Sequence, residues 1–169
     1  MEKRNVTVSA IVAAIVLIGD QLSKHWAETW LRTNGEYKIW DGVLHLRYVE
    51  NRGAAFGMMQ GGKWFFLAIT GIACAAMLYF LIKERKRLHF MMTFSIALLL
   101  SGAIGNLIDR VALGYVRDMI YVALIDFAVF NVADMAVTVG CCLLVLDLLF
   151  FKGKKYMDCL LYTSDAADD

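Results

Sequence analysis

Several features of soluble enzymes and nucleic-acid-binding proteins are absent from this sequence. Proline is missing altogether, so none of the apolar runs in the 169 residues is broken by it. The formal net charge is only +1, which gives no indication of nucleic-acid binding. The four cysteines have no metal-ligand spacing, and all but one lie in apolar runs, so we interpret them as small buried hydrophobic residues. They are Cys74, Cys141, Cys142 and Cys159.

The common hydrolytic motifs are also missing. The three histidines form no His-Glu-x-x-His motif for zinc. There is no Gly-x-Ser-x-Gly, and no serine or cysteine has a histidine evidently placed to activate it. Carboxylates are the groups that remain for hydrolytic chemistry, and we expect no metal, nucleotide or other cofactor.

Apolar residues are abundant instead. They make up 60% of the chain, and the mean hydropathy is +0.58, whereas a soluble domain is closer to half apolar. A bilayer core of about 30 Å needs roughly 20 helical residues. The runs that are long enough lie near residues 6–26, 64–82, 90–108 and 130–151. They predict a mainly α membrane protein, a four-transmembrane-helix bundle formed by one polytopic domain over residues 1–158.

Clusters of basic residues predict the orientation of these spans. They precede the first span, fill the loop between the second and third, and follow the fourth, at Lys3, Arg4, Lys83, Arg85, Lys86, Arg87, Lys152, Lys154 and Lys155. The positive-inside rule places these three sites and both termini in the cytoplasm. Residues 27–63 and 109–129 then lie outside.

The first outer segment predicts β-structure. Residues 43–50 partly alternate between apolar and polar side chains and are rich in strand-forming residues. The small residues of 51–57 follow and permit close backbone approach. We expect a small extracytoplasmic sheet whose edge is suited to binding a peptide by strand addition. Small residues within the spans, Gly71 with Ala75 and Ser101 with Gly105, predict closely packed helices.

Polar residues within the spans gather near their outer ends. Asp20, Asn106 and Asp134 all fall a turn or two below the outer surface. An ionised carboxylate in hydrocarbon costs about 3 kcal/mol, and Asp134 has no lysine or arginine at helical spacing on its own helix. Two carboxylates brought together can share one proton, as in aspartic proteases. The residues alone leave three partners open for Asp134, which are Asp109, Asp118 and Asp126.

Other polar residues are expected to be structural. Asp20 and Lys24 are four apart and predict an ion pair along one helix face. Asn106 is expected to bridge helices, and Asp109 to form a solvated pair with its neighbour Arg110 at a helix end. Asp147 is near the inner end, where we expect it to pair with lysines.

Five segments, in order, resemble the motifs of the bacterial lipoprotein signal peptidases, also called signal peptidase II. They are residues 20–24, 51–56, 101–110, 116–120 and 130–134. The second resembles Asn-x-Gly-Ala-Ala-Phe, and the third ends in Asn-x-x-Asp-Arg. The last two resemble the catalytic aspartate motifs of the family. Any single match is weak, but the set on four spans is specific, and the similarity extends to about residue 157.

The resemblance implies an intramembrane aspartic endopeptidase with Asp118 and Asp134 as its catalytic pair. It implies supporting or substrate-binding roles for Asp20, Lys24, Asn51, Gly53, Gly102, Asn106, Asp109, Arg110, Asn131 and Ala133. The family's substrates are prolipoproteins carrying diacylglyceryl-cysteine, which are cut just before that cysteine. The resemblance also implies a β-cradle, a mobile outer helix or flap before the fourth span, a monomer in the bacterial cytoplasmic (inner) membrane, contact with membrane lipid, and inhibition by globomycin.

The match has departures and leaves alternatives. Arg117 stands where the family usually has an apolar residue, and we expect its charge to favour ionised Asp118. Arg117 is also the only feature that suggests the alternative of an inactive homologue. A membrane subunit of an ion pathway is a further alternative, since carboxylates suit proton relays. Residues 159–169 end the chain with small and acidic residues, which we interpret as sequencing-adapter read-through or a disordered tail.

Overall fold

The computed structural model describes residues 3–53 and 63–151. The end of the second family motif (54–56), the basic residues after the fourth span and the tail at 159–169 lie outside these ranges. In chain order the elements are α1 (Lys3–Trp26), the π-helix η1 (Ala27–Leu31), α2 (Arg32–Asn34), β1 (Tyr37–Trp40), β2 (Leu44–Asn51), α3 (Lys63–Lys83), α4 (Phe90–Ala112), β3 (Val116–Val122), the 3-10 helix η3 (Ala123–Ile125) and α5 (Val132–Phe150).

The predicted four-helix membrane bundle is confirmed. Within the described ranges, four helical segments are long and apolar enough to cross a membrane: Asn5–Asn34, Trp64–Lys83, Phe90–Ala112 and Val132–Phe150. Large apolar side chains such as Ile72 and Phe150 are exposed on them, as expected of lipid-facing surfaces. The first segment has 30 residues and is about 45 Å long, so it extends beyond a hydrocarbon core of about 30 Å.

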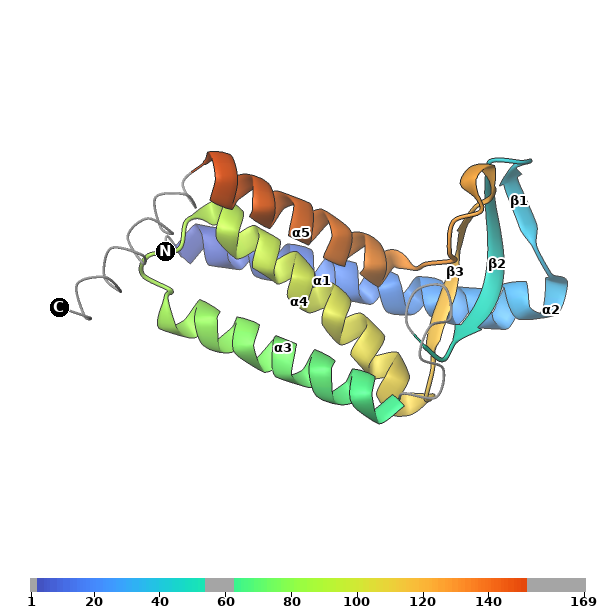
Figure 1. Ribbon diagram of the computed structural model, residues 1–169, viewed down its shortest axis with the longest axis horizontal. Helices are drawn as coiled ribbons and strands as arrows, with labels where there is room; N and C mark the ends of the chain where they lie inside the picture. Colours follow the sequence, from blue (N-terminus) through green and yellow to red (C-terminus); the bar gives the residue numbers. More distant parts are fainter. Residues whose placement is uncertain (1–2, 54–62, 152–169) are drawn as a thin grey trace.

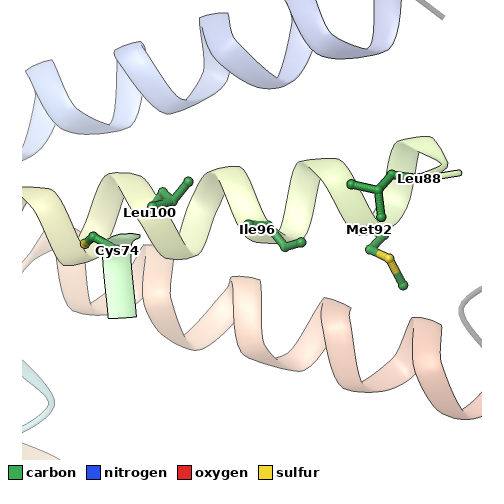
Figure 2. Packing of buried hydrophobic residues seen from close by; sticks show 5 residues of the cluster. All are labelled: Cys74, Leu88, Met92, Ile96 and Leu100. Atoms are coloured by element: carbon green, nitrogen blue, oxygen red, sulfur yellow. The ribbon is translucent and has the colours of Figure 1, made fainter. Parts of the chain in front are cut away.

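Helix α4 lies at the centre of the bundle. It packs against α1, α3 and α5, and it is the most buried of the four spans (Figure 1). A buried apolar cluster follows α4 and includes Cys74 of α3; the cluster consists of Cys74, Leu88, Met92, Ile96 and Leu100 (Figure 2). Close packing with α5 depends on Gly102, because a Cβ there would collide with the backbone oxygen of Ala133.

A small sheet stands at one end of the bundle, and the N-terminus lies at the other (Figure 1). Its three antiparallel strands are in the order β1-β2-β3. Strand β2 confirms the strand predicted at 43–50, and η3 is a short helix between the sheet and α5. Strand β3 is a strand that sequence analysis missed. Residue Phe130, just before α5, pairs with Ile120 on the other edge of β3.

At the end of the bundle remote from the sheet, Asp147 pairs with a histidine, and the lysines that follow the fourth span lie outside the described residues. The Asp147 carboxylate is fully buried, and its Oδ1 lies 2.8 Å from Nε2 of His89. His89 is the N-cap residue of α4, so this contact joins the start of α4 to the end of α5.

Candidate active site

The chain path brings Asp118 and Asp134 together. Asp118 is the third residue of β3, and Phe130 is bound to the same strand by two backbone hydrogen bonds with Ile120, of 3.0 and 2.8 Å. Asn131 follows at once as the N-cap of α5, which places Asp134 in the first turn of that helix. The pairing of Phe130 with the edge of β3 therefore places the start of α5 beside Asp118.

Both carboxylates line one cavity of about 540 Å³ at the sheet end of the bundle. Its polar lining comes from α4, β2, β3 and α5, and much of the rest is apolar, including Val116, Phe127 and Phe130. Six of the residues predicted for the site line this cavity. They are Asn51, Gly53, Asn106, Arg110, Asp118 and Asp134.

Asn131 is bound to both carboxylates. Its side-chain Nδ2 donates to Asp118 Oδ1 at 2.6 Å, and its backbone N donates to Asp134 Oδ2 at 3.2 Å. In return, Asp134 N donates to Asn131 Oδ1 at 2.9 Å. This reciprocal pair is a capping box, which satisfies free N–H groups at the start of α5. The same residue thus starts the helix and fixes the two acids relative to each other.

Two further asparagines complete the hydrogen bonding of the pair. Asn51 Nδ2, at the end of β2, donates to Asp118 Oδ2 at 3.0 Å. Asn106 Nδ2, on α4, donates to Asp134 Oδ1 at 2.7 Å. Each carboxylate therefore accepts hydrogen bonds on both oxygens, which limits rotation of the side chain. Asn51 is itself oriented by Gly53, whose N donates to Asn51 Oδ1 at 3.0 Å.

A buried charge cluster lies behind the asparagines. Lys24 Nζ is 2.9 Å from Asp20 Oδ2 and 3.7 Å from Asp109 Oδ2, and all three side chains are fully buried. The ion pair predicted between Asp20 and Lys24 is therefore confirmed. Lys24 Nζ also donates to Asn106 Oδ1 at 2.8 Å, which turns the amide N of Asn106 toward Asp134.

Small residues allow these helices to approach. Asp20 Oδ1 accepts a hydrogen bond of 2.9 Å from Ala133 N, joining α1 to the start of α5. A Cβ at Gly105 would lie 2.6 Å from Asp20 Oδ2, so glycine leaves room for that carboxylate.

Arg110 lines the cavity, and its guanidinium lies 5.1 Å from the ring centroid of Phe66 on α3.

Of the three partners left open for Asp134, one shares its cavity within the described ranges. Asp126 is exposed and accepts a hydrogen bond of 2.6 Å from Tyr121 Oη. Asp109 is fully buried against cations, so the solvated pair expected for it with Arg110 was wrong. Asp118 is the remaining acid and lines the cavity with Asp134.

Comparison with known proteins places this arrangement in a family. The family profile described as Signal peptidase (SPase) II matches residues 12–150. The chain belongs to the signal peptidase II family. It is 46% identical over 142 residues to the lipoprotein signal peptidase of Streptococcus thermophilus (strain CNRZ 1066), covering 83% of this chain and 92% of that one. It is 44% identical over 146 residues to that of Clostridioides difficile (strain 630), covering 86% and 97%.

A solved structure, described as a bacterial membrane enzyme determined by the in meso method at 2.3 Å resolution, has the same fold. It superposes with a TM-score of 0.78 at 36% identity, covering 85% of this chain and 88% of that one. The likeness to a solved bacterial membrane enzyme is therefore consistent with the family that the sequence comparison shows.

In this signal peptidase II family member, the effect expected of Arg117 was wrong. The Arg117 guanidinium does not face Asp118. It binds Asp109 on the other side of the strand, with Nη2 donating to Asp109 Oδ1 at 2.8 Å. Burial, and secondly the negative charge of Asp134, raise the pKa of Asp118 to about 7, although hydrogen bonds from Asn51 and Asn131 oppose the shift. Asp118 thus keeps its proton in the range where an ordinary aspartate is ionised.

Sequence analysis missed two residues of the site, Gln21 and Glu28. Gln21 Nε2 donates to Asp20 Oδ2 and to Gly105 O, both at 3.1 Å. Glu28 Oε2 accepts a hydrogen bond of 2.9 Å from Arg117 Nη1. With Lys24 they follow an i, i+3, i+7 spacing, and that periodicity is a signal that would have put them on one helix face. Within the described ranges, no cluster of three or more His, Cys, Asp or Glu residues is arranged to hold a metal.

Proposed function

We propose that this chain is a lipoprotein signal peptidase that cleaves its substrate with an aspartate pair, Asp118 and Asp134. The observation that carries this proposal is the shared cavity, in which one residue, Asn131, is hydrogen-bonded to both acids. A peptidase in which water attacks the peptide bond directly needs a group that takes a proton from the water, and a group that gives a proton to the scissile carbonyl completes the step. Two adjacent carboxyl groups holding one proton supply both.

In the proposed reaction, the ionised aspartate accepts a proton from water as the water oxygen attacks the scissile carbonyl carbon. The protonated aspartate donates its proton to the carbonyl oxygen, which gives a tetrahedral diol. In the collapse of the diol the C–N bond breaks, the protonated aspartate gives its proton to the amine of the departing cysteine, and the other aspartate takes a proton from a diol hydroxyl, so the pair again holds one proton. The shared proton belongs to the pair rather than to one fixed residue.

The location of the cavity fits a substrate that is partly in lipid. It lies at the sheet end of four membrane-spanning helices, and apolar residues make up much of its lining. A diacylglyceryl group on the substrate's cysteine can remain in the bilayer while the peptide bond beside it reaches the two acids. We propose that the sheet end faces outward from the bacterial cytoplasmic membrane, with the basic loop after α3 in the cytoplasm. Arg110 and Asn51 would then orient the substrate backbone.

A paired substrate assay tests this function. Purified protein in detergent is incubated with a prolipoprotein that carries diacylglyceryl-cysteine, and with the same protein lacking the lipid. We expect cleavage of the lipidated form, with the new N-terminus at the modified cysteine by mass spectrometry, and little cleavage of the other. Equal cleavage of both forms, or a cut elsewhere, would contradict the proposed specificity. Globomycin is expected to inhibit the cleavage.

The activity is expected to fall above about pH 7. Because the pKa of Asp118 is raised to about 7, the pair keeps its proton below that pH and loses it above. With no proton to donate to the carbonyl, the rate is expected to drop by about tenfold for each further pH unit. The measurement is kcat/KM against pH. Samples held at high pH and returned to neutral pH must recover full activity, and a constant rate across the alkaline range would refute the expectation.

A further inference from the structure

Arg117 is attached to α4 and to the first membrane span, where its guanidinium contacts Glu28 and Gln21, and its neighbour Asp118 is attached to neither. The side chain of Arg117 is nearly buried, with 10% exposure. Its Nε and Nη2 donate to the two carboxylate oxygens of Asp109 on α4, at 3.1 and 2.8 Å, and its backbone N donates to Asp109 Oδ2 at 2.9 Å. Its Nη1 donates to Glu28 Oε2, in η1, at 2.9 Å. One residue of β3 thus bridges α4 and the end of the first membrane span.

This bridge acts on one face of β3 only. Successive residues of a strand point to opposite faces, so the Arg117 side chain leads to the helices and that of Asp118 to the cavity. The Arg117–Asp109 contact has two parallel N–H···O bonds, a geometry that fixes direction as well as distance. Hydrogen bonding to Asp109 also raises the pKa of Arg117, so the guanidinium is charged at every pH of interest.

We propose that Arg117 is a positioning residue for catalysis, whose contacts with Asp109 and Glu28 hold β3 so that Asp118 stays beside Asp134. This inference rests on the proposed function of the two acids. It assigns to Arg117 a role exerted through the strand, because the guanidinium contacts neither acid of the pair.

The physical need for such a restraint comes from the charges around Asp118. Asp134 faces it from α5, Arg110 from α4 and Lys24 from α1, and β2 contributes the neutral Asn51. When both acids are ionised they repel each other, and a strand free to move would carry Asp118 away. The pair would then lose the coupling and the burial that keep its proton at neutral pH.

Two substitutions separate position from charge. Arg117→Met keeps an unbranched, flexible side chain, although a shorter one, and removes the charge and all donors. Arg117→Lys keeps the charge but cannot form the two-nitrogen fork. We expect kcat to fall by about 10- to 100-fold in both, with KM nearly unchanged, because small misplacements of reacting groups cost that much. We also expect the alkaline limb of the pH profile to move down by about one pH unit. A charge effect alone would leave Arg117→Lys at the wild-type rate.

Glu28→Gln provides a milder variant, since it weakens one contact and leaves Asp109 bound. The alkaline limb of the pH profile of Glu28→Gln is expected to move down by a smaller amount. If Arg117→Met does not fold, the pH profile of Glu28→Gln tests the positioning role instead. The matched control is Arg47→Met on the neighbouring strand, where the guanidinium lies 3.6 Å from the ring centroid of Tyr121. This control is expected to retain the wild-type pH profile.

The outcomes are distinct. A lower kcat together with a displaced limb in the Arg117 variants, and neither change in Arg47→Met, supports the inference. An unchanged limb overturns it, and a lower melting temperature alone would then assign Arg117 a purely structural role. Failure of the wild-type protein to cut the lipidated substrate would instead contradict the proposed function, and it is read from the same assay before any variant is compared.

Discussion

Replacing either acid of the pair by asparagine is expected to abolish cleavage, with a fall in kcat of about 1,000-fold or more. Asparagine has nearly the same size and still accepts a hydrogen bond, so the cavity around Asp118 and Asp134 should keep its shape. It can neither take a proton from water nor give one to the carbonyl, and proton transfer by a positioned side chain contributes about 10²- to 10⁴-fold. The measurement is the cleavage of lipidated substrate by Asp118→Asn and Asp134→Asn.

Asp126→Asn is the matched control for these variants. Asp126 lies only eight residues from Asp118 and from Asp134, but its side chain is exposed and bonded to Tyr121 Oη. Its substitution is expected to leave the rate within about twofold, as for most surface changes. Activity that survives Asp118→Asn but is lost in Asp126→Asn would show that the wrong partner had been chosen for Asp134. Full activity in Asp134→Asn would reject the aspartate pair as the catalytic group.

The spans and the polar end of the bundle were predictable because the bilayer imposes simple rules. A chain in hydrocarbon must satisfy its backbone hydrogen bonds internally, so long apolar runs become helices. Polar residues that recur at helical spacing then share a face, which is why Asp20 and Lys24 form the predicted pair and Asn106 bridges α1 to α5. Which residues share a helix face depends only on their spacing along the chain, so it can be read from a single sequence.

Strand β3 was not predictable by the same means. A half-buried strand alternates between apolar and polar residues, but Val116, Arg117, Asp118 and Met119 are all buried, so the alternation is absent. The error about Arg117 follows from this one. Adjacent residues of a strand point to opposite faces, so Arg117 is next to Asp118 in sequence while its charge is directed at Asp109.

The sequence also does not predict which small residues lie at helix contacts, or which residues far apart in the chain are partners. The Gly71 and Gly105 patterns were similar, but a Cβ at Gly71 would meet nothing within 4 Å, whereas one at Gly105 would collide with Asp20. Sequence spacing therefore does not distinguish a glycine at a helix contact from one on an open face. His89 and Asp147 are 58 residues apart, and their contact depends on how α4 and α5 cross.

Replacing Lys24 by methionine is expected to lower the free energy of unfolding by about 3–5 kcal/mol, because it leaves buried carboxylates without their cation. Asp20 would keep its hydrogen bonds from Ala133 and Gln21, but its negative charge would be uncompensated. The measurement is denaturant unfolding in detergent. Lys38→Met is the control, since Lys38 forms an exposed pair with Asp41 and its loss should leave the free energy of unfolding nearly unchanged.

A double variant separates the stabilising effect of Lys24 from its effect on catalysis. Changing Asp20→Asn together with Lys24→Met removes both charges of the pair, so most of the lost stability should return. The activity should not return, because Asn106 would still lack the Lys24 ammonium that turns its amide N toward Asp134. If cleavage recovers along with stability, the ammonium acts on folding alone, and the orientation of Asn106 does not depend on it. If stability recovers and cleavage stays low, the charge cluster behind the cavity controls the geometry of the acids in front of it.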